Sequence, residues 1–206
     1  VGKSHILLLD ALLKLRQVCC DPRLLSLSEA SIAHGTSAKL EALMDLLDNL
    51  VGEGRRVLVF SQFTSMLQLI EEELRARNYD YLKLTGQTVH RQAMVEKFQE
   101  GNTPVFLISL KAGGTGLNLT RADTVIHYDP WWNPAVEDQA TDRSHRIGQE
   151  NPVFVYKLIT SGTVEEAILG MQDKKRQLVE GVLSADPAKA LTLSEEDIEQ
   201  FFVPLT

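Results

Sequence analysis

The first fifty residues carry apolar side chains at helical spacing. One helical face is predicted over residues 4–20, and its apolar positions are Leu8, Leu12, Leu15 and Cys19. Asp21-Pro22 ends this helix, because the residue before a proline avoids helical backbone angles. A polar stretch over 26–36 predicts a linker, and Ser37 predicts the N-cap of a second amphipathic helix that ends near Gly52.

Beyond residue 56 the pattern changes to short apolar runs that alternate with helical segments. Strands are predicted over 57–60, 81–84, 105–108, 124–128 and 153–159. Helices are predicted over 64–77, 88–99, 135–145 and 163–183. Strands that are apolar along their whole length and alternate with helices indicate an α/β fold with a parallel sheet covered on both faces. The loops that follow the strands then share one edge, where such sheets bind their ligands.

The net charge of the chain limits how it can contact nucleic acid. The chain has 206 residues with 21 Lys and Arg against 28 Asp and Glu, a net charge of −7. Residues 186–206 hold one lysine and five carboxylates, so the rest of the chain carries only −3. A nucleic-acid contact would therefore have to be local. The adjacent pair Cys19 and Cys20 offers no metal-ligand spacing and indicates reduced thiols in an intracellular protein.

A glycine-rich segment, 109–118, follows the third predicted strand. Its glycines let the backbone turn sharply and present successive N–H groups to a phosphate, and they are Gly113, Gly114 and Gly116. Ser109, Lys111 and Thr115 add donors. The spacing does not match a dinucleotide-binding fingerprint, and a tight structural turn explains the segment equally well.

Residues 137–149 form the most unusual segment. A helix would place Arg143 and Arg146 on one face, with Gln139 nearby. Two guanidinium groups at the ligand edge suit an anion such as a nucleotide γ-phosphate. The alternative is a solvated face on which the arginines pair with Glu137, Asp138 and Asp142.

The loop 129–134 holds both tryptophans, Trp131 and Trp132. An exposed tryptophan after a strand can stack on a base or enter a groove, whereas a buried one anchors the loop. We expect one of each. His127 is predicted to be a core or edge residue, and neither it nor His145 has a candidate metal partner.

Several motifs occurring in order resemble the second RecA-like lobe of a Swi/Snf-type DNA-dependent ATPase of helicase superfamily two. They are VLVFSQF at 57–63, LTG at 84–86 with Arg91 downstream, SLKAGGTGLNL at 109–119, DPWWNP at 129–134 and QATDRSHRIGQ at 139–149. LRQVCCDP at 15–22 resembles the lead-in of such lobes. The resemblance covers about residues 5–183, and the R-x-x-R-I-G-Q ending is its most specific part.

The resemblance implies a role for each motif. Arg143 and Arg146 would be arginine fingers, seated by Gln139, and Ser109 with the loop over Gly113, Gly114 and Gly116 would couple nucleotide to DNA. The residues implied to touch DNA are Ser61, Gln62, Thr85, Arg91, Lys111, Asn118 and Trp132. The implied partners are double-stranded DNA and an N-terminal RecA-like lobe of the same protein, which would bind most of the ATP and Mg²⁺. No metal site, no membrane partner and a monomeric chain are expected.

The same resemblance divides the chain into a lead-in (1–36), a RecA-like lobe (37–162), a brace helix (163–185) and an acidic tail (186–206). The tail is either a docking helix, with Ser194 as its N-cap, or a frayed end.

The 206 residues contain no Walker A motif and no DEGH-like box, so we expect this chain alone not to hydrolyse ATP. Two alternatives stay open, a strand-separating helicase lobe and a non-catalytic interaction module. The expected location is the nucleus in a eukaryote, or the cytoplasm or nucleoid in a bacterium.

Overall fold

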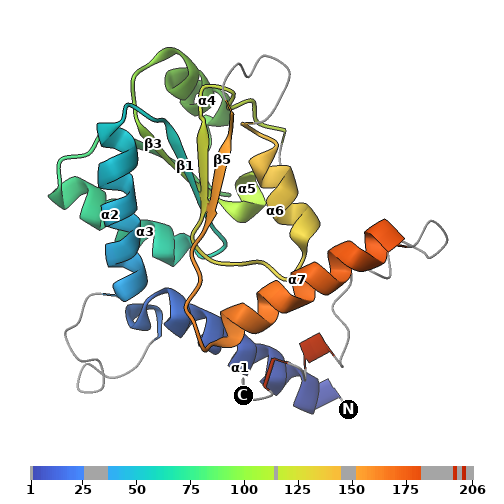
Figure 1. Ribbon diagram of the computed structural model, residues 1–206. Helices are drawn as coiled ribbons and strands as arrows, with labels where there is room; N and C mark the ends of the chain where they lie inside the picture. The colour runs from blue at the N-terminus through green and yellow to red at the C-terminus, as the bar shows by residue number, and fades with distance from the viewer. Residues whose placement is uncertain are drawn as a thin grey trace.

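The computed structural model describes residues 2–25, 37–113, 116–144, 152–181, 197–198 and 201–202. At its centre is a sheet of five parallel strands in the order β2-β3-β1-β4-β5. The strands are β1 (Val57–Ser61), β2 (Tyr81–Leu84), β3 (Val105–Ser109), β4 (Thr124–His127) and β5 (Phe154–Lys157). Each predicted strand is confirmed, and the α/β class with it. In Figure 1 the strands run downward, so their carboxyl ends meet at the lower edge of the sheet.

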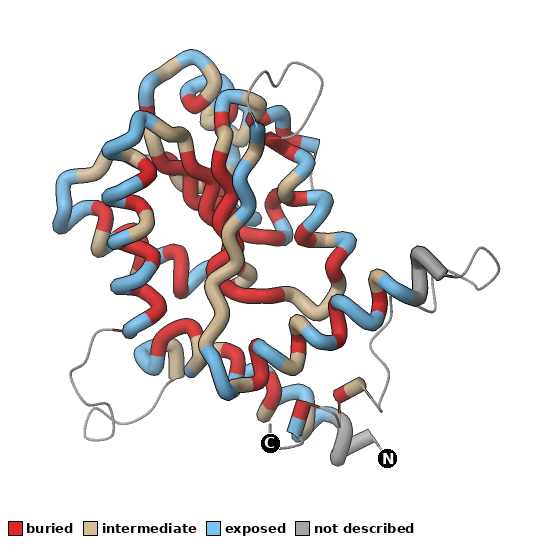
Figure 2. The backbone as a smooth tube through the Cα atoms, in the orientation of Figure 1, coloured by how far each residue is buried: buried red, intermediate tan, exposed pale blue. Residues whose placement is uncertain are grey.

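Helices cover both faces of this sheet, because alternate strand residues point to opposite sides. On one face α2 (Ala38–Gly52) and α3 (Thr64–Ala76) pack against Val57 and Val59 of β1. On the other face α4 (Arg91–Glu100), α5 (Leu110–Gly113) and α6 (Pro134–Thr141) lie over Leu58 and Phe60. Figure 2 shows the central strands buried between the two layers.

A third apolar cluster lies below the carboxyl edge. Helix α1 (Gly2–Cys20) and helix α7 (Val164–Gly181) contact each other there, and a short 3₁₀ turn, η1 (Pro22–Leu24), follows α1. The cluster consists of Leu12, Val164, Ile168, Met171 and Phe201. Phe201 is only 6% exposed and neighbouring Ile198 only 2%, so the described parts of the acidic tail pack on the molecule. The predicted cap Ser194 lies outside the described residues.

Two helix boundaries differ from the sequence-based prediction by three or four residues. Helix α4 begins at Arg91 and not at Thr88, because the Thr88 hydroxyl accepts the Thr85 N–H (2.9 Å) and closes a turn. Helix α6 ends at Thr141 and not at His145. The Arg143 and Ser144 amides bond three residues back, to Ala140 and Thr141, and the Ser144 hydroxyl also donates to the Thr141 carbonyl (2.9 Å). Short-range bonds of this kind compete with helix continuation.

Candidate functional site

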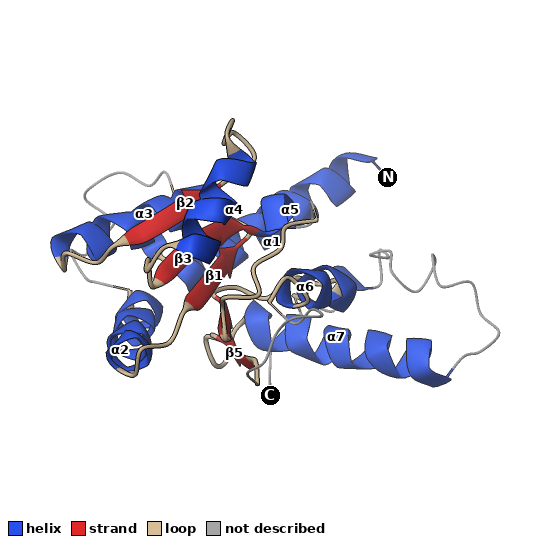
Figure 3. Ribbon diagram, turned by 90° about the horizontal axis from the view of Figure 1, so that it is seen from above, coloured by secondary structure: helices blue, strands red, loops and turns tan. Residues whose placement is uncertain are grey.

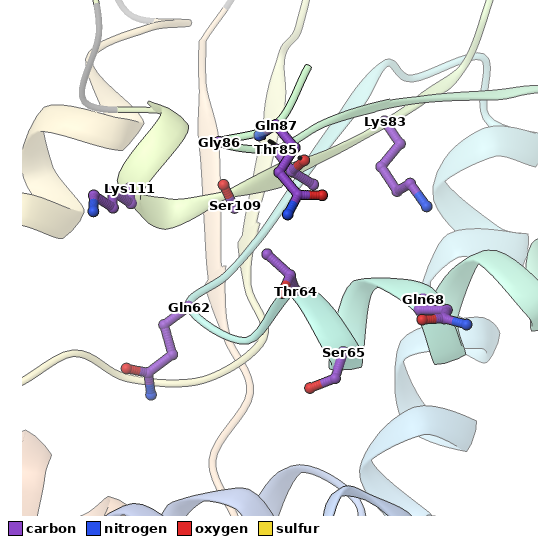
Figure 4. A pocket seen from close by; sticks show the side chains of 10 residues that line it. All are labelled: Gln62, Thr64, Ser65, Gln68, Lys83, Thr85, Gly86, Gln87, Ser109 and Lys111. Atoms are coloured by element: carbon purple, nitrogen blue, oxygen red, sulfur yellow. Dashed lines mark hydrogen bonds between the residues drawn. The ribbon is translucent and has the colours of Figure 1, made fainter. Parts of the chain in front are cut away.

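A polar pocket lies where the first three strands end. Its volume is about 540 Å³, and Figure 4 shows the residues around it. They come from the ends of β1, β2 and β3 and the start of α3, and they are Gln62, Thr64, Ser65, Gln68, Lys83, Thr85, Gly86, Gln87, Ser109 and Lys111. Four residues predicted to touch phosphate or couple nucleotide to DNA meet here, namely Gln62, Thr85, Ser109 and Lys111. Parallel strands bring them together, because their carboxyl ends share one edge.

The charge of this pocket is opposite to that of the chain. Two lysines and no carboxylate occur among its described lining residues, although the chain as a whole carries −7. Lys83 is paired with Glu71 of α3. Lys111 is exposed and forms no ion pair with any residue that the structure describes. The pocket is therefore suited to an anion.

Two further donors face this space. Helix α3 begins at Thr64 without a side-chain cap from the described residues, so the amides of its first turn keep their partial positive charge. The Gln62 side-chain nitrogen is buried and has no hydrogen-bond partner in the described part of the chain. An unsatisfied buried donor costs free energy, and an anionic ligand would supply its acceptor.

Ser61 differs from the prediction that it contacts phosphate. It is 1% exposed, and its hydroxyl donates to Asp129 Oδ1 (2.5 Å) while accepting the Phe63 N–H (3.1 Å). Asp129 Oδ2 also accepts the Gln62 N–H (3.3 Å). Burial raises the pKa of Asp129, and the Ser61 hydrogen bond and the positive charge of Arg16 oppose that rise. Ser61 thus anchors the turn after β1, because both functions of its hydroxyl are used inside the protein.

The glycine-rich segment also differs from a continuous phosphate-binding loop. Residues Leu110–Gly113 form α5, so Gly113 ends a helical turn. A Cβ at Gly113 would lie 2.7 Å from the Phe60 ring, and Gly116 has a φ of +67°. Gly113 is therefore required for close packing and Gly116 for a left-handed turn. Gly114 and Thr115 lie outside the described residues, and Asn118 is exposed.

Arg91 lies beside the pocket and does not line it. Its guanidinium donates to the Gly86 carbonyl (3.2 Å) from the first residue of α4. It therefore supports the turn that carries Thr85 and Gly86 to the pocket. A phosphate contact by Arg91 stays a prediction, since periodicity alone does not show whether a side chain faces a cavity or a backbone carbonyl.

The arginine segment shows the largest difference from the prediction. Arg143 follows the end of α6, which leads away from the carboxyl edge in Figure 1, and it is only 5% exposed. The sequence predicts the Arg143 guanidinium at the ligand edge of the sheet, and the burial of Arg143 differs from that prediction. Gln139 is exposed on α6, whereas Arg146 and His145 lie outside the described residues. Of the described residues predicted to act on ATP, Gln139 is exposed and Arg143 is buried. Only part of the predicted set is therefore open to a nucleotide.

A backbone contact nevertheless links this arginine segment to the pocket. The Leu119 N–H donates to the Arg143 carbonyl (2.9 Å). Leu119 lies ten residues after Ser109, at the far end of the segment that begins in the pocket wall. Helices α5 and α6 also contact each other. The arginine segment and the segment that begins in the pocket wall are thus in contact at this point.

The two tryptophans are both half-buried, so the expectation of one buried and one exposed ring is wrong. Trp131 packs against the core, with the Arg16 guanidinium 5.0 Å from its ring centre. Trp132 packs against the cluster of α1 and α7, with the Lys175 ammonium 4.9 Å from its ring centre. The rings themselves lie 5.7 Å apart. The cation over Trp131 belongs to α1 and the cation over Trp132 belongs to α7. Sequence spacing does not reveal either contact.

His127 is a core residue, as predicted. It is 2% exposed, stacks on Phe60, and its Nε2 lies 3.0 Å from the Thr141 hydroxyl. Within the described ranges, no three His, Cys, Asp or Glu side chains are grouped to hold a metal ion. None of the described helices combines the length and apolar character needed to cross a membrane.

The sheet order, the helices on both faces and the polar carboxyl edge define a RecA-like α/β lobe. The family model of the helicase conserved C-terminal domain matches residues 38–148. The SWI2/SNF2 ATPase core of Sulfolobus solfataricus, solved in complex with dsDNA, superposes with a TM-score of 0.71 and 34% identity over 97% of this chain and 42% of that one.

Two curated relatives extend this likeness. The chain is 40% identical to YwqA of Bacillus subtilis over 95% of its length, and 46% identical to the human chromatin-remodeling ATPase INO80 over 79%. It spans 22% of YwqA and 11% of INO80. The chain belongs to the helicase C-terminal domain family, as the C-terminal lobe of a Swi/Snf-type protein of helicase superfamily two.

Proposed function

We propose that this chain is the C-terminal motor lobe of an ATP-dependent double-stranded-DNA translocase that remodels protein–DNA complexes. The observation that carries the proposal is the pocket, whose described walls hold two lysines and no carboxylate in a chain of net charge −7. The names of the relatives support it, since one is a chromatin-remodeling ATPase and one solved core is bound to dsDNA.

The pocket would hold phosphates of the DNA backbone. The donors are the Gln62 amide, the Thr85 hydroxyl, the Lys111 ammonium and the first turn of α3. Such contacts position a duplex without reading its sequence. Binding is therefore expected to be insensitive to sequence and to weaken steeply with salt. Asn118 and Trp132 are proposed as further DNA contacts, Asn118 because it is exposed beyond the left-handed turn at Gly116.

ATP and Mg²⁺ would be held mainly by the other lobe, where they supply the phosphoryl group and the charge that neutralises it. Arg146 is our candidate for the guanidinium that meets the γ-phosphate, with Gln139 and Arg143 arranging its segment. Because the Leu119–Arg143 bond joins that segment to the chain that continues from the pocket wall, closure of the two lobes would couple phosphate chemistry to the grip on DNA. Without the other lobe, this chain is not expected to hydrolyse ATP.

Replacing Lys111 with Ala tests the pocket. We expect the affinity for a duplex of arbitrary sequence to fall and the slope of log K against log salt to decrease by about 1, because one phosphate contact is lost. Fluorescence anisotropy at several salt concentrations measures both. Lys97→Ala is the matched control, since Lys97 is exposed on α4 and does not line the pocket. Equal effects of the two variants would contradict a phosphate site in the pocket.

A further inference from the structure

A buried carboxylate lies directly behind the pocket. Asp129 follows β4, and the pairing of Phe60 with His127 brings it next to Ser61 at the end of β1. The Tyr128 N–H donates to the Phe60 carbonyl (2.9 Å) and extends that pairing by one residue. The side chain of Asp129 is 4% exposed, so it does not touch a ligand itself.

Asp129 fixes the turn that forms one wall of the pocket. Its two oxygens accept the Ser61 hydroxyl (2.5 Å) and the Gln62 N–H (3.3 Å). The same Ser61 oxygen accepts the Phe63 N–H (3.1 Å), and α3 begins at the following residue. One carboxylate therefore sets both the path of Gln62 and the start of α3, which are two of the donors that face the pocket.

Buried cations hold the strand end that carries this carboxylate. Arg16 of α1 donates to the Pro130 carbonyl (3.1 Å), and Lys39 of α2 donates to the Tyr128 carbonyl (3.2 Å). Lys39 also pairs with Glu165 of α7 at 2.5 Å. The position of Asp129 is thus defined by three helices outside the sheet, which makes the carboxylate a rigid support.

We infer that Asp129 is a positioning residue, which holds the Gln62 amide and the first turn of α3 in the geometry that binds backbone phosphates. This inference rests on the proposed function of the pocket. Neither orientation of an asparagine side chain replaces the carboxylate, because its NH₂ group would face either the Gln62 N–H or the Ser61 hydroxyl. In the second case the Ser61 hydroxyl hydrogen loses the acceptor that Asp129 Oδ1 provides.

The test is Asp129→Asn in the full-length protein that contains this chain, with anisotropy of a labelled 20-base-pair duplex over a salt series. We expect an affinity loss of about tenfold at every salt concentration and an unchanged slope of log K against log salt, because the misplaced donors are neutral and no cation is lost. The matched control is Asp123→Asn. Asp123 also accepts a backbone N–H, from Arg56, and a hydroxyl, from Thr124, but at the opposite edge of the sheet.

A purely structural role would lower the melting temperature of Asp129→Asn and leave the duplex affinity of the folded variant at the wild-type value, which would overturn the inference. If that variant does not fold, Ser61→Ala removes only the hydroxyl, and the same loss of affinity is expected. If Lys111→Ala and Gln62→Ala also leave binding unchanged, the proposed function of the pocket fails. If they weaken binding and Asp129→Asn does not, only the role of Asp129 fails.

Discussion

His127 is a neutral imidazole inside the core. Burial lowers its pKa from 6.5 to about 4, so its neutral form stabilises the fold fully above pH 6.5, and that stabilisation is lost as the pH falls toward 4. We expect the free energy of unfolding to decrease by about 2 kcal/mol between pH 7.5 and pH 5 from this group alone. Urea titrations at both values measure it.

The control for this prediction replaces His127 with Gln, which cannot titrate. That variant is expected to be less stable at pH 7.5, because it loses the stacking on Phe60, but to lose less stability on acidification. His90→Gln is expected to behave as wild type, since His90 is exposed before α4. Parallel pH profiles for wild type and His127→Gln would show that another group governs the acid response.

At single residues, the sequence predicts which loops lie together but not which hydrogen bonds their side chains form. The loops that follow the strands bring Gln62, Thr85 and Lys111 to one pocket, because parallel strands share their carboxyl edge. The motifs do not show that the Ser61 hydroxyl donates to Asp129, since this hydrogen bond joins residues 68 positions apart. Hydrogen-bond partners across a fold are set by register and burial, which a local motif does not contain.

At the scale of elements, a buried ion pair ties α2 to α7. Lys39 and Glu165 are 6% and 1% exposed in their side chains. Lys39→Met is expected to cost about 3 kcal/mol or more of unfolding free energy, because Glu165 stays buried without its cation. The double variant Lys39→Met/Glu165→Leu should recover part of this loss. Lys14→Met breaks the exposed pair with Asp10 and serves as the control, with an expected change below about 0.5 kcal/mol.

The described end of the acidic tail is a second element-scale contact. Phe201→Ala should reduce the unfolding free energy by about 3 kcal/mol, because the ring fills the cluster of α1 and α7. Phe202→Ala, at a ring that is 36% exposed, should change it by at most about 1 kcal/mol. Thermal unfolding of the two variants compares them directly. Equal effects would mean that the tail does not dock as described.

Strands were predicted more closely than helix ends. Mostly apolar runs define the fully buried strands β1, β3 and β4 to within one residue at each end, since such a strand needs apolar side chains on both faces. The edge strands β2 and β5 are only partly buried, and each contains a lysine. The end of α6 depends on how Ser144 and Thr141 bond to the backbone, and α5 is a single turn with little periodicity. Both features follow from local hydrogen bonds and not from amphipathic spacing.

At the scale of the whole molecule, α1 and α7 lie next to each other at the carboxyl edge, and α6 lies beside α7 in Figure 3. The side chains exposed on α1 include Ile6, Leu7 and Leu13, which are 66%, 69% and 42% exposed. The chain covers 42% of the solved SWI2/SNF2 core. These exposed apolar side chains make part of α1 an apolar surface of the described lobe.

We propose that this lobe supplies a guanidinium, that of Arg146, to a nucleotide held by the other lobe. The most direct test of this proposal is DNA-stimulated ATP turnover of the full-length protein carrying Arg146→Ala. We predict that turnover falls by a factor of about 10³ while affinity for duplex DNA is retained, because only stabilisation of the transition state is lost. Turnover equal to wild type at saturating DNA and ATP would contradict the account.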